Sequence, residues 1–291
     1  MVEGTLPPGV KIWWVDMTYE RLADAGLNYF PCRYGKSRLM FRGPKCRLDA
    51  PYVAVIGGTE TYGKFCPAPY PDVLEDHIGM SVVNFGAVNA GIDVFKDDAT
   101  ILDICSGARA VVLQIMGAHN LSNRFYSVHP RRNDRFLMAA PALRELYQDI
   151  DFTDFNFTRH LVQSLSDADV DKFARVKQEL QTAWVWRMRG LIGAIAAPVI
   201  LLWMAPRSPA ASDDLFVASD PLFIDDMLLQ RVQGGTVKTI SVRSDEAAVK
   251  PTKEGLIFSE IEAAAAAEVP NAVAHRIAAE ALAEGLQQIN L

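Results

Sequence analysis

Three loops in this sequence carry residue types that hydrolysis and group transfer use. They read IGGTETYG (56–63), NFGAVNAG (84–91) and MGAHN (116–120). A hydroxyl such as that of Thr59 becomes a nucleophile when a neighbouring base removes its proton. His119 is the first candidate for that base, and the adjacent Asn120 could donate a hydrogen bond to a substrate oxygen. We therefore expect Thr59, His119 and Asn120 to be the catalytic residues.

Other readings of these residues stay open. Further candidate bases are His129, His160 and Glu60. Thr59 could instead bond only to its own turn, as short polar residues often do. We expect His77 and His275, which fall in helical patterns, to have structural roles.

The segment NLSNRFYSVHPRRNDRF (120–136) directly follows the third loop. Its basic residues are Arg124, His129, Arg131, Arg132 and Arg135, against the single acid Asp134. Arginine forks suit carboxylate, sulfate or phosphate groups, and the interleaved aromatic rings could stack on a sugar or base. We therefore predict an anionic ligand here, although a solvated charged surface is the alternative. The predicted substrate-binding residues are Gly58, Glu60, Tyr62, Asn89, Arg124, His129, Arg131 and Arg132.

Short apolar runs must position these loops. Three of them end in glycine, at 52–57, 81–86 and 109–117, and two more follow at 198–206 and 236–243. Helical patterns separate them, including a long one over 169–196, so the pattern predicts an α/β fold with a mainly parallel five-stranded sheet and helices on both faces. In such sheets ligands bind beyond the carboxyl ends of the strands. Gly58, Gly86 and Gly117 should therefore lie at one edge of the sheet.

The chain divides into two predicted parts. Residues 1–50 have weak periodicity and many turn formers, which predicts an N-terminal extension packed on the core. Residues 51–291 form the α/β domain. Within it, residues 118–168 are polar, aromatic and rich in arginine, and we expect this insertion to cover the site.

The order and spacing of the loops resemble the first three blocks of the SGNH (GDSL-type) esterase and acyltransferase superfamily. In the GDSxTxG block, Gly58 stands in the aspartate slot and Thr59 in the nucleophile slot. The second block matches at Asn84, but Asn89 stands where the glycine of the oxyanion hole is usual. The GxND block matches at Gly117 and Asn120. The resemblance implies a flavodoxin-like three-layer α/β/α sandwich.

The last block of that superfamily, DxxHPN, is incomplete here. Ala266 occupies the acid slot and Val269 the base slot, while Pro270 and Asn271 match. The resemblance therefore implies a remodelled or degenerate triad. The segments IGGTETYG and HPRRNDRF also look like signatures of a family of uncharacterised bacterial proteins.

Three functions follow as hypotheses. The first is ester hydrolysis or acyl transfer on an anionic or sugar-bearing substrate. The second is a non-catalytic protein that binds an anion or carbohydrate. The third is a transferase of a sulfuryl or glycosyl group. The sequence has no Walker A motif and no GxGxxG motif, which disfavours nucleotide hydrolysis and dinucleotide redox chemistry.

Composition limits the partners. The net charge of −6 argues against extensive nucleic-acid binding. The four cysteines lack metal-ligand spacing, so we expect no metal site. Read as reduced thiols, they suit a cytoplasmic protein. We also expect no cofactor. The apolar stretch 190–205 is short and contains Pro198, which argues against a membrane span. We expect a small-molecule or glycan-type partner, and the oligomeric state stays open.

Overall fold

The computed structural model describes residues 26–210, 220–235, 238–243 and 252–289. Five parallel strands form the central sheet in the order β2-β1-β3-β6-β7. Their bounds are β1 Tyr52–Gly57, β2 Ser81–Gly86, β3 Ala110–Gln114, β6 Val199–Ala205 and β7 Lys238–Arg243. The fold prediction is confirmed, and the predicted start of the last strand at 236–237 lies outside the described residues.

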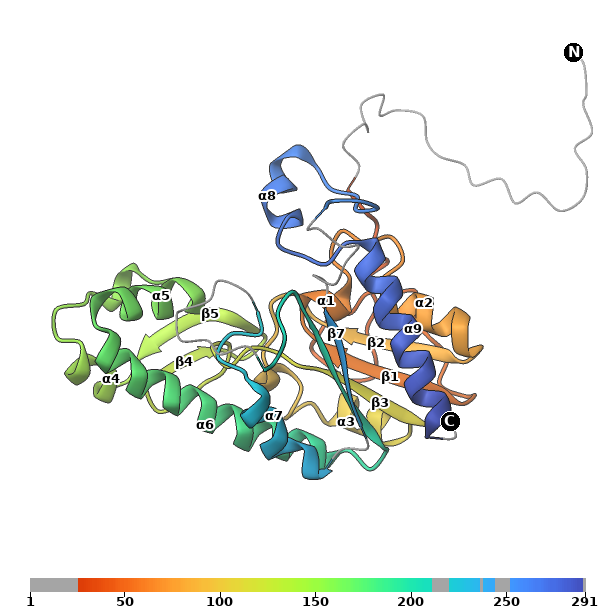
Figure 1. The fold of residues 1–291 in the computed structure, drawn as a ribbon, viewed down its shortest axis with the longest axis horizontal. Helices are drawn as coiled ribbons and strands as arrows, with labels where there is room; N and C mark the ends of the chain where they lie inside the picture. Colours follow the sequence, from red (N-terminus) through yellow and green to blue (C-terminus); the bar gives the residue numbers. More distant parts are fainter. Residues whose placement is uncertain (1–25, 211–219, 236–237, 244–251, 290–291) are drawn as a thin grey trace, which may run out of the picture.

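Both faces of the sheet are covered, which explains why its strands are apolar throughout. Val53 and Val55 of β1 join one buried cluster with residues of α2 (Tyr70–Ile78) and α9 (Ala272–Gln288). Ala54 and Ile56 of the same strand join the opposite cluster. That face is covered by α3 (Ala99–Ser106), α6 (Val170–Ala194) and α7 (Asp226–Val232). Figure 1 shows α2 and α9 together on one side of the sheet and α6 with α7 on the other.

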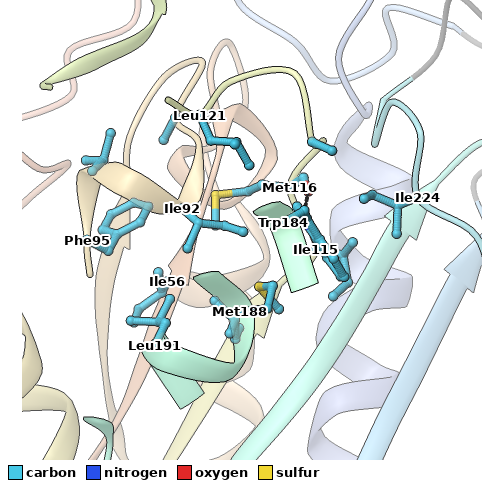
Figure 2. Packing of buried hydrophobic residues seen from close by; sticks show 14 of the residues in the cluster. Ile56, Ile92, Phe95, Ile115, Met116, Leu121, Trp184, Met188, Leu191 and Ile224 are labelled. Atoms are coloured by element: carbon cyan, nitrogen blue, oxygen red, sulfur yellow. Dashed lines mark hydrogen bonds between the residues drawn. The ribbon is translucent and has the colours of Figure 1, made fainter. Parts of the chain in front are cut away.

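The long helix α6 contributes Trp184, one of the largest fully buried side chains, to this second cluster. Figure 2 shows Trp184, Met188 and Leu191 packed beside Ile56 and other buried residues near the end of β1. The indole of Trp184 is fully buried, and its Nε1 donates to the Met116 carbonyl at 2.8 Å. This bond ties the helix to the backbone that follows β3.

Between β3 and α6 the chain forms a separate group of small elements. These are β4 (Tyr126–His129), β5 (Arg132–Ala139), α4 (Pro141–Leu146), the 3-10 turn η2 (Phe152–Asp154) and α5 (Thr158–Ala168). Strands β4 and β5 pair as an antiparallel hairpin. Figure 1 shows the group at the left of the view, away from α2 and α9.

The remaining elements are short. They are α1 (Thr59–Tyr62), η1 (Ile92–Val94), η3 (Gln233–Gly235), η4 (Glu260–Glu262) and α8 (Ala263–Ala266). Helix α7 begins at Asp226, and the Asp225 side chain caps it by accepting the Leu228 N–H. The 3-10 turn η4 begins with a capping box at Ser259.

The N-terminal segment packs on the sheet domain from residue 26 onward. Phe41 and Tyr34 are buried against Phe85 of β2, with ring centroids 5.0 and 5.3 Å apart. The first 25 residues of the predicted extension lie outside the described residues. Within the described chain, no helix combines the length and the apolar character needed to cross a membrane.

Candidate functional site

The carboxyl ends of β1, β2 and β3 bring the three predicted loops together. Gly57 pairs in register with Gly86, and the Ala87 N–H donates to the Gly57 carbonyl at 3.1 Å. On the other flank of β1, the strand β3 leads into residues 115–120, which are all buried. The loops therefore form one edge, which we call the carboxyl edge.

Thr59 begins helix α1 at this edge, and Asn89 holds its hydroxyl. Oγ1 accepts the Asn89 N–H at 2.9 Å and donates to the Asn89 Oδ1 at 3.1 Å. Asn89 adopts a left-handed backbone conformation with φ 54°, which asparagine tolerates better than most residues. Its Nδ2 also donates to the Asp134 carboxylate of β5 at 3.3 Å. In the part of the chain that the structure describes, no histidine hydrogen-bonds to Thr59.

The side chain of Asn120 makes two hydrogen bonds, one of them to the same loop. Its Oδ1 accepts the Thr158 hydroxyl at 2.5 Å, and its Nδ2 donates to the Asn89 carbonyl at 3.4 Å. Gly91 passes so close that a Cβ built there would lie 1.7 Å from the Asn120 carbonyl oxygen. Only glycine fits at this contact. The predicted Asn120 thus lies next to the predicted Asn89.

Glu60 is held by a residue that sequence reasoning missed, Gln114 at the end of β3. Gln114 Oε1 accepts the Gly58 N–H at 2.9 Å and the Thr61 hydroxyl at 2.6 Å. Because this oxygen is an acceptor, the amide orientation is determined and Nε2 must face Glu60. It donates to Glu60 Oε2 at 2.6 Å. Burial raises the pKa of the Glu60 carboxyl, and the bond from Gln114 partly opposes this rise.

His119 is buried near the same edge and faces a carboxylate. Its side chain is 4% exposed, and its Nδ1 lies 3.9 Å from Asp220 Oδ1. Among the described residues, Nδ1 has no hydrogen-bond partner. Burial lowers the pKa of His119 to about 4, although the Asp220 charge works in the opposite direction. Asp220 also forms an ion pair with Arg159 at the start of α5. His119 is therefore neutral at neutral pH, with a carboxylate beside Nδ1.

The predicted basic residues are distributed differently. Arg124 forms an ion pair with Glu179 of α6 at 3.2 Å. Arg131 and Arg132 are exposed at the turn of the β4–β5 hairpin. His129 is half-buried at the same turn, where its Nδ1 accepts the Arg131 N–H at 3.2 Å. Within the described chain, none of these four residues forms a hydrogen bond or ion pair with Thr59.

Two other predicted residues lie beside the edge. Gly58 directly precedes α1, and its N–H donates to Gln114 Oε1. Tyr62, at the end of α1, directs its ring toward Tyr29 with centroids 5.1 Å apart. The alternative base His160 is exposed and lies against Phe155, at 4.9 Å between ring centroids.

The C-terminal block has a structural role in the described chain. Ala266 lies in α8, and the Asn271 side chain caps α9 by accepting the Ala274 N–H at 3.0 Å. His275 is buried, and its Nδ1 accepts the Tyr70 N–H at 3.1 Å. Burial lowers its pKa to about 3. These contacts fit the structural role expected for His275.

Sequence reasoning missed Asp220 and Thr158 as well as Gln114. The sequence does contain a signal for Gln114, because it is a polar residue in an otherwise apolar strand. Asp220 and Thr158 had none, since they reach the carboxyl edge only through the folding of distant segments. Among the described residues, no group of three or more His, Cys, Asp or Glu side chains could hold a metal ion.

Solved structures with a related arrangement include three esterases or lipases. The lipase Lip_vut3 from a goat rumen metagenome shares 9% identity at TM-score 0.43, over 80% of this chain and 96% of its own. A catalytic mutant of the acetylxylan esterase Axe2 from Geobacillus stearothermophilus shares 14% at TM-score 0.43, over 83% and 94%. A putative lipolytic protein of the G-D-S-L family from Desulfitobacterium hafniense shares 12% at TM-score 0.35, over 81% and 99%.

These similarities are too distant to transfer a substrate or a mechanism. No curated protein matches the sequence. One family model does match, the Domain of unknown function (DUF6473), and it spans residues 17–290. Because that match covers nearly the whole sequence, the chain belongs to the DUF6473 family.

Proposed function

We propose that this protein hydrolyses an ester, or transfers its acyl group, at the carboxyl edge. Thr59 is the nucleophile, His119 the general base and Asp220 the carboxylate that orients the imidazole. One observation carries the proposal: the Nδ1 of a buried, neutral histidine lies 3.9 Å from a carboxylate and has no hydrogen-bond partner among the described residues. This distance exceeds a hydrogen bond, but catalytic contacts are often long before substrate binds.

The chemistry follows from these roles. With Asp220 beside Nδ1, the proton of neutral His119 stays on Nδ1, and Nε2 is left to accept one. Thr59 Oγ1 attacks the carbonyl carbon while its proton passes to His119. The carbon–oxygen bond to the leaving alcohol then breaks, and His119 returns the proton to that alcohol. Water, or a second alcohol in a transfer, removes the acyl group from Thr59 by the reverse route.

Thr59 must change its partner before it reacts. Its hydroxyl donates to the Asn89 amide oxygen, which is too weakly basic to remove a proton. Substrate must therefore release Thr59 from Asn89. Asn120 uses one N–H of Nδ2 on the Asn89 carbonyl, and its second N–H is the proposed donor to the substrate oxygen.

The proposed substrate is a small or glycan-type ester with an anionic or sugar group. Arg159, whose side chain is 43% exposed beside Asp220, supports an anionic group at this position. The four free cysteine thiols support the further proposal that the protein works in the cytoplasm.

A second candidate is a binding protein without catalysis. It is favoured by the contact between Thr59 and Asn89, because both hydrogen bonds of the Thr59 hydroxyl are satisfied by that one residue. In this case the edge would bind the same class of ligand and leave it unchanged.

The test is a panel of aryl esters and acetylated sugars assayed with wild type, Thr59→Ala and His119→Gln. His77→Gln is the matched control, because His77 is exposed near the end of α2, just before β2 begins, whereas the carboxyl edge lies at the other end of β2. We expect His119→Gln to lower kcat/KM by about 10²–10⁴-fold, the usual contribution of a general base. Thr59→Ala should abolish turnover, and His77→Gln should leave it unchanged. Turnover unaffected by both site variants would refute the proposal, and no turnover on any ester would favour the binding protein.

A further inference from the structure

Glu60 lies at the carboxyl edge but has no part in the mechanism proposed above. It follows Thr59 in α1 and is half-buried, and its Oε2 accepts a hydrogen bond from Gln114 Nε2 at 2.6 Å. In the described chain, no other residue donates to its second oxygen, Oε1. This oxygen is not enclosed by the protein. One oxygen of the carboxyl group is therefore fixed, and the other is available to a ligand.

A buried chain of polar side chains fixes Oε2. Thr61 Oγ1 donates to Gln114 Oε1 at 2.6 Å, and the Tyr70 hydroxyl lies 2.9 Å from the same Thr61 oxygen. Since the Thr61 proton is used on Gln114, the Tyr70 hydroxyl must donate to Thr61. All three side chains are buried. The donors therefore point in one direction, from Tyr70 through Thr61 and Gln114 to Glu60.

This chain serves the edge more than the interior. Burying an amide and two hydroxyls costs free energy unless each group is hydrogen-bonded, whereas apolar side chains would fill the same space without that requirement. Here each member bonds to the next. The result is a carboxyl group held in one position, and such fixed geometry is what a binding site needs.

The position of Gly58 relates Glu60 to the proposed nucleophile. A Cβ built on Gly58 would lie 3.2 Å from Glu60 Oε2 and 3.9 Å from the Ala90 carbonyl oxygen. Ala90 adjoins Asn89, which holds the Thr59 hydroxyl. The Glu60 carboxyl and the loop that holds the nucleophile are therefore both within about 4 Å of one point above Gly58.

Electrostatic contacts relate Glu60 to the proposed base. Besides burial, which raises the pKa of Glu60, the charge of Asp220 raises it and that of Arg159 lowers it. Asp220 lies beside His119. In the proposed mechanism His119 returns the proton to the leaving alcohol, so the alcohol part of the ester would lie on this side of the edge.

We propose that Glu60 Oε1 accepts a hydrogen bond from a hydroxyl group next to the ester, on the alcohol part of the substrate. The residue thereby gives the enzyme specificity for esters of diols and sugars. This inference rests on the proposed function of the same edge. An ionised carboxylate accepts hydrogen bonds and repels anions, so its partner is a hydroxyl, and any anionic group of the substrate would lie away from it.

The test compares three acetates of similar size. The first, 2-hydroxyethyl acetate, carries the hydroxyl. In 2-methoxyethyl acetate the oxygen has lost its proton, and in propyl acetate a methyl group replaces the hydroxyl. The kcat/KM of each is measured at about pH 8, where an ordinary carboxyl is ionised.

The proteins are wild type, Glu60→Gln and the matched control Glu145→Gln. The glutamine oxygen of Glu60→Gln can accept from Gln114, which leaves its NH2 group, a donor, in place of Oε1. Glu145→Gln removes the same charge from an exposed position on α4. Comparing esters within each protein separates a lost hydrogen bond from a general loss of activity or stability, because a general loss affects all three esters alike.

We expect wild type and Glu145→Gln to prefer 2-hydroxyethyl acetate over both other esters by about 10- to 100-fold, the usual effect of a hydrogen bond to a charged group. In Glu60→Gln the preference over 2-methoxyethyl acetate should disappear while propyl acetate is still turned over. Turnover without a preference for the hydroxyl, or a preference that Glu60→Gln retains, would overturn the inference and leave the proposed function intact. No turnover of any of the three would count against the proposed function, and this inference would fall with it.

Discussion

The most specific prediction for a single residue concerns His119 and the pH dependence of kcat/KM. A general base works only when it is unprotonated, and the pKa of His119 is lowered from 6.5 to about 4 by burial. We therefore expect kcat/KM to stay constant as the pH falls through 6.5 and to decline only near pH 4. The measurement is a pH profile with the best ester of the panel.

Asp220→Asn provides the internal check on this profile. The Asp220 charge raises the pKa of His119, so its removal should move the acid limb to still lower pH. The rate on the plateau should fall at the same time, because the imidazole loses the carboxylate that orients it. An acid limb at the ordinary histidine value in wild type would contradict the role given to His119.

The contact between Gly91 and Asn120 gives a second prediction at the residue scale. A Cβ at position 91 would lie 1.7 Å from the Asn120 carbonyl oxygen, so Gly91→Ala must displace the loop that holds Thr59. We expect the free energy of unfolding to drop by more than about 2 kcal/mol. Gly190→Ala on α6 is the control, since a Cβ built there would meet no atom within 4 Å apart from its chain neighbours and the nearby backbone of its own helix. That change should raise stability by up to about 1 kcal/mol. Urea unfolding of both variants measures these free energies. A Gly91→Ala variant as stable as wild type would contradict the prediction, because it would show that the loop can move freely.

At the scale of elements, His275 links helix α9 to α2. It accepts the Tyr70 N–H, and its pKa in the folded protein is about 3, against an ordinary value of 6.5. Between these values the unfolded chain binds a proton that the folded protein does not. The free energy of unfolding should therefore decrease as the pH falls from 6.5, by about 1.4 kcal/mol per pH unit for this group.

His275→Gln tests that linkage, because the glutamine side chain is polar and does not titrate. The variant should lose part of the pH dependence of stability below 6.5 and keep the fold. His77→Gln, at an exposed position on α2, should leave the pH dependence as in wild type. An unchanged slope in His275→Gln would show that His275 becomes protonated without unfolding.

The elements themselves were largely predictable from the sequence. All five strands fall within the predicted runs, because buried parallel strands are short, continuously apolar and separated by helical patterns. The long helix was also expected at 169–196 and is found at Val170–Ala194. The short elements were less predictable, since capping by Asp225 or Ser259 depends on which turn the tertiary contacts favour.

At the scale of the whole molecule, the sequence predicted where the site lies better than which side chains share it. Thr59, Asn89 and Asn120 meet because their loops follow adjacent parallel strands, a rule of topology. Asp220 reaches His119 from a loop after β6, and Arg124 turns away to Glu179. Such contacts depend on side-chain packing between segments far apart in sequence, which local patterns do not encode.

The central claim is that Thr59 becomes acylated, and peptide mapping by mass spectrometry tests it most directly. Wild type is incubated with an aryl acetate, quenched in acid, digested and analysed for peptides that gained one acetyl group. We predict acetylation of Thr59 in wild type and in His77→Gln, and its absence in His119→Gln and Thr59→Ala. Turnover of the ester with no acetyl group on Thr59, or labelling of Thr59 that His119→Gln leaves unchanged, would contradict the claim.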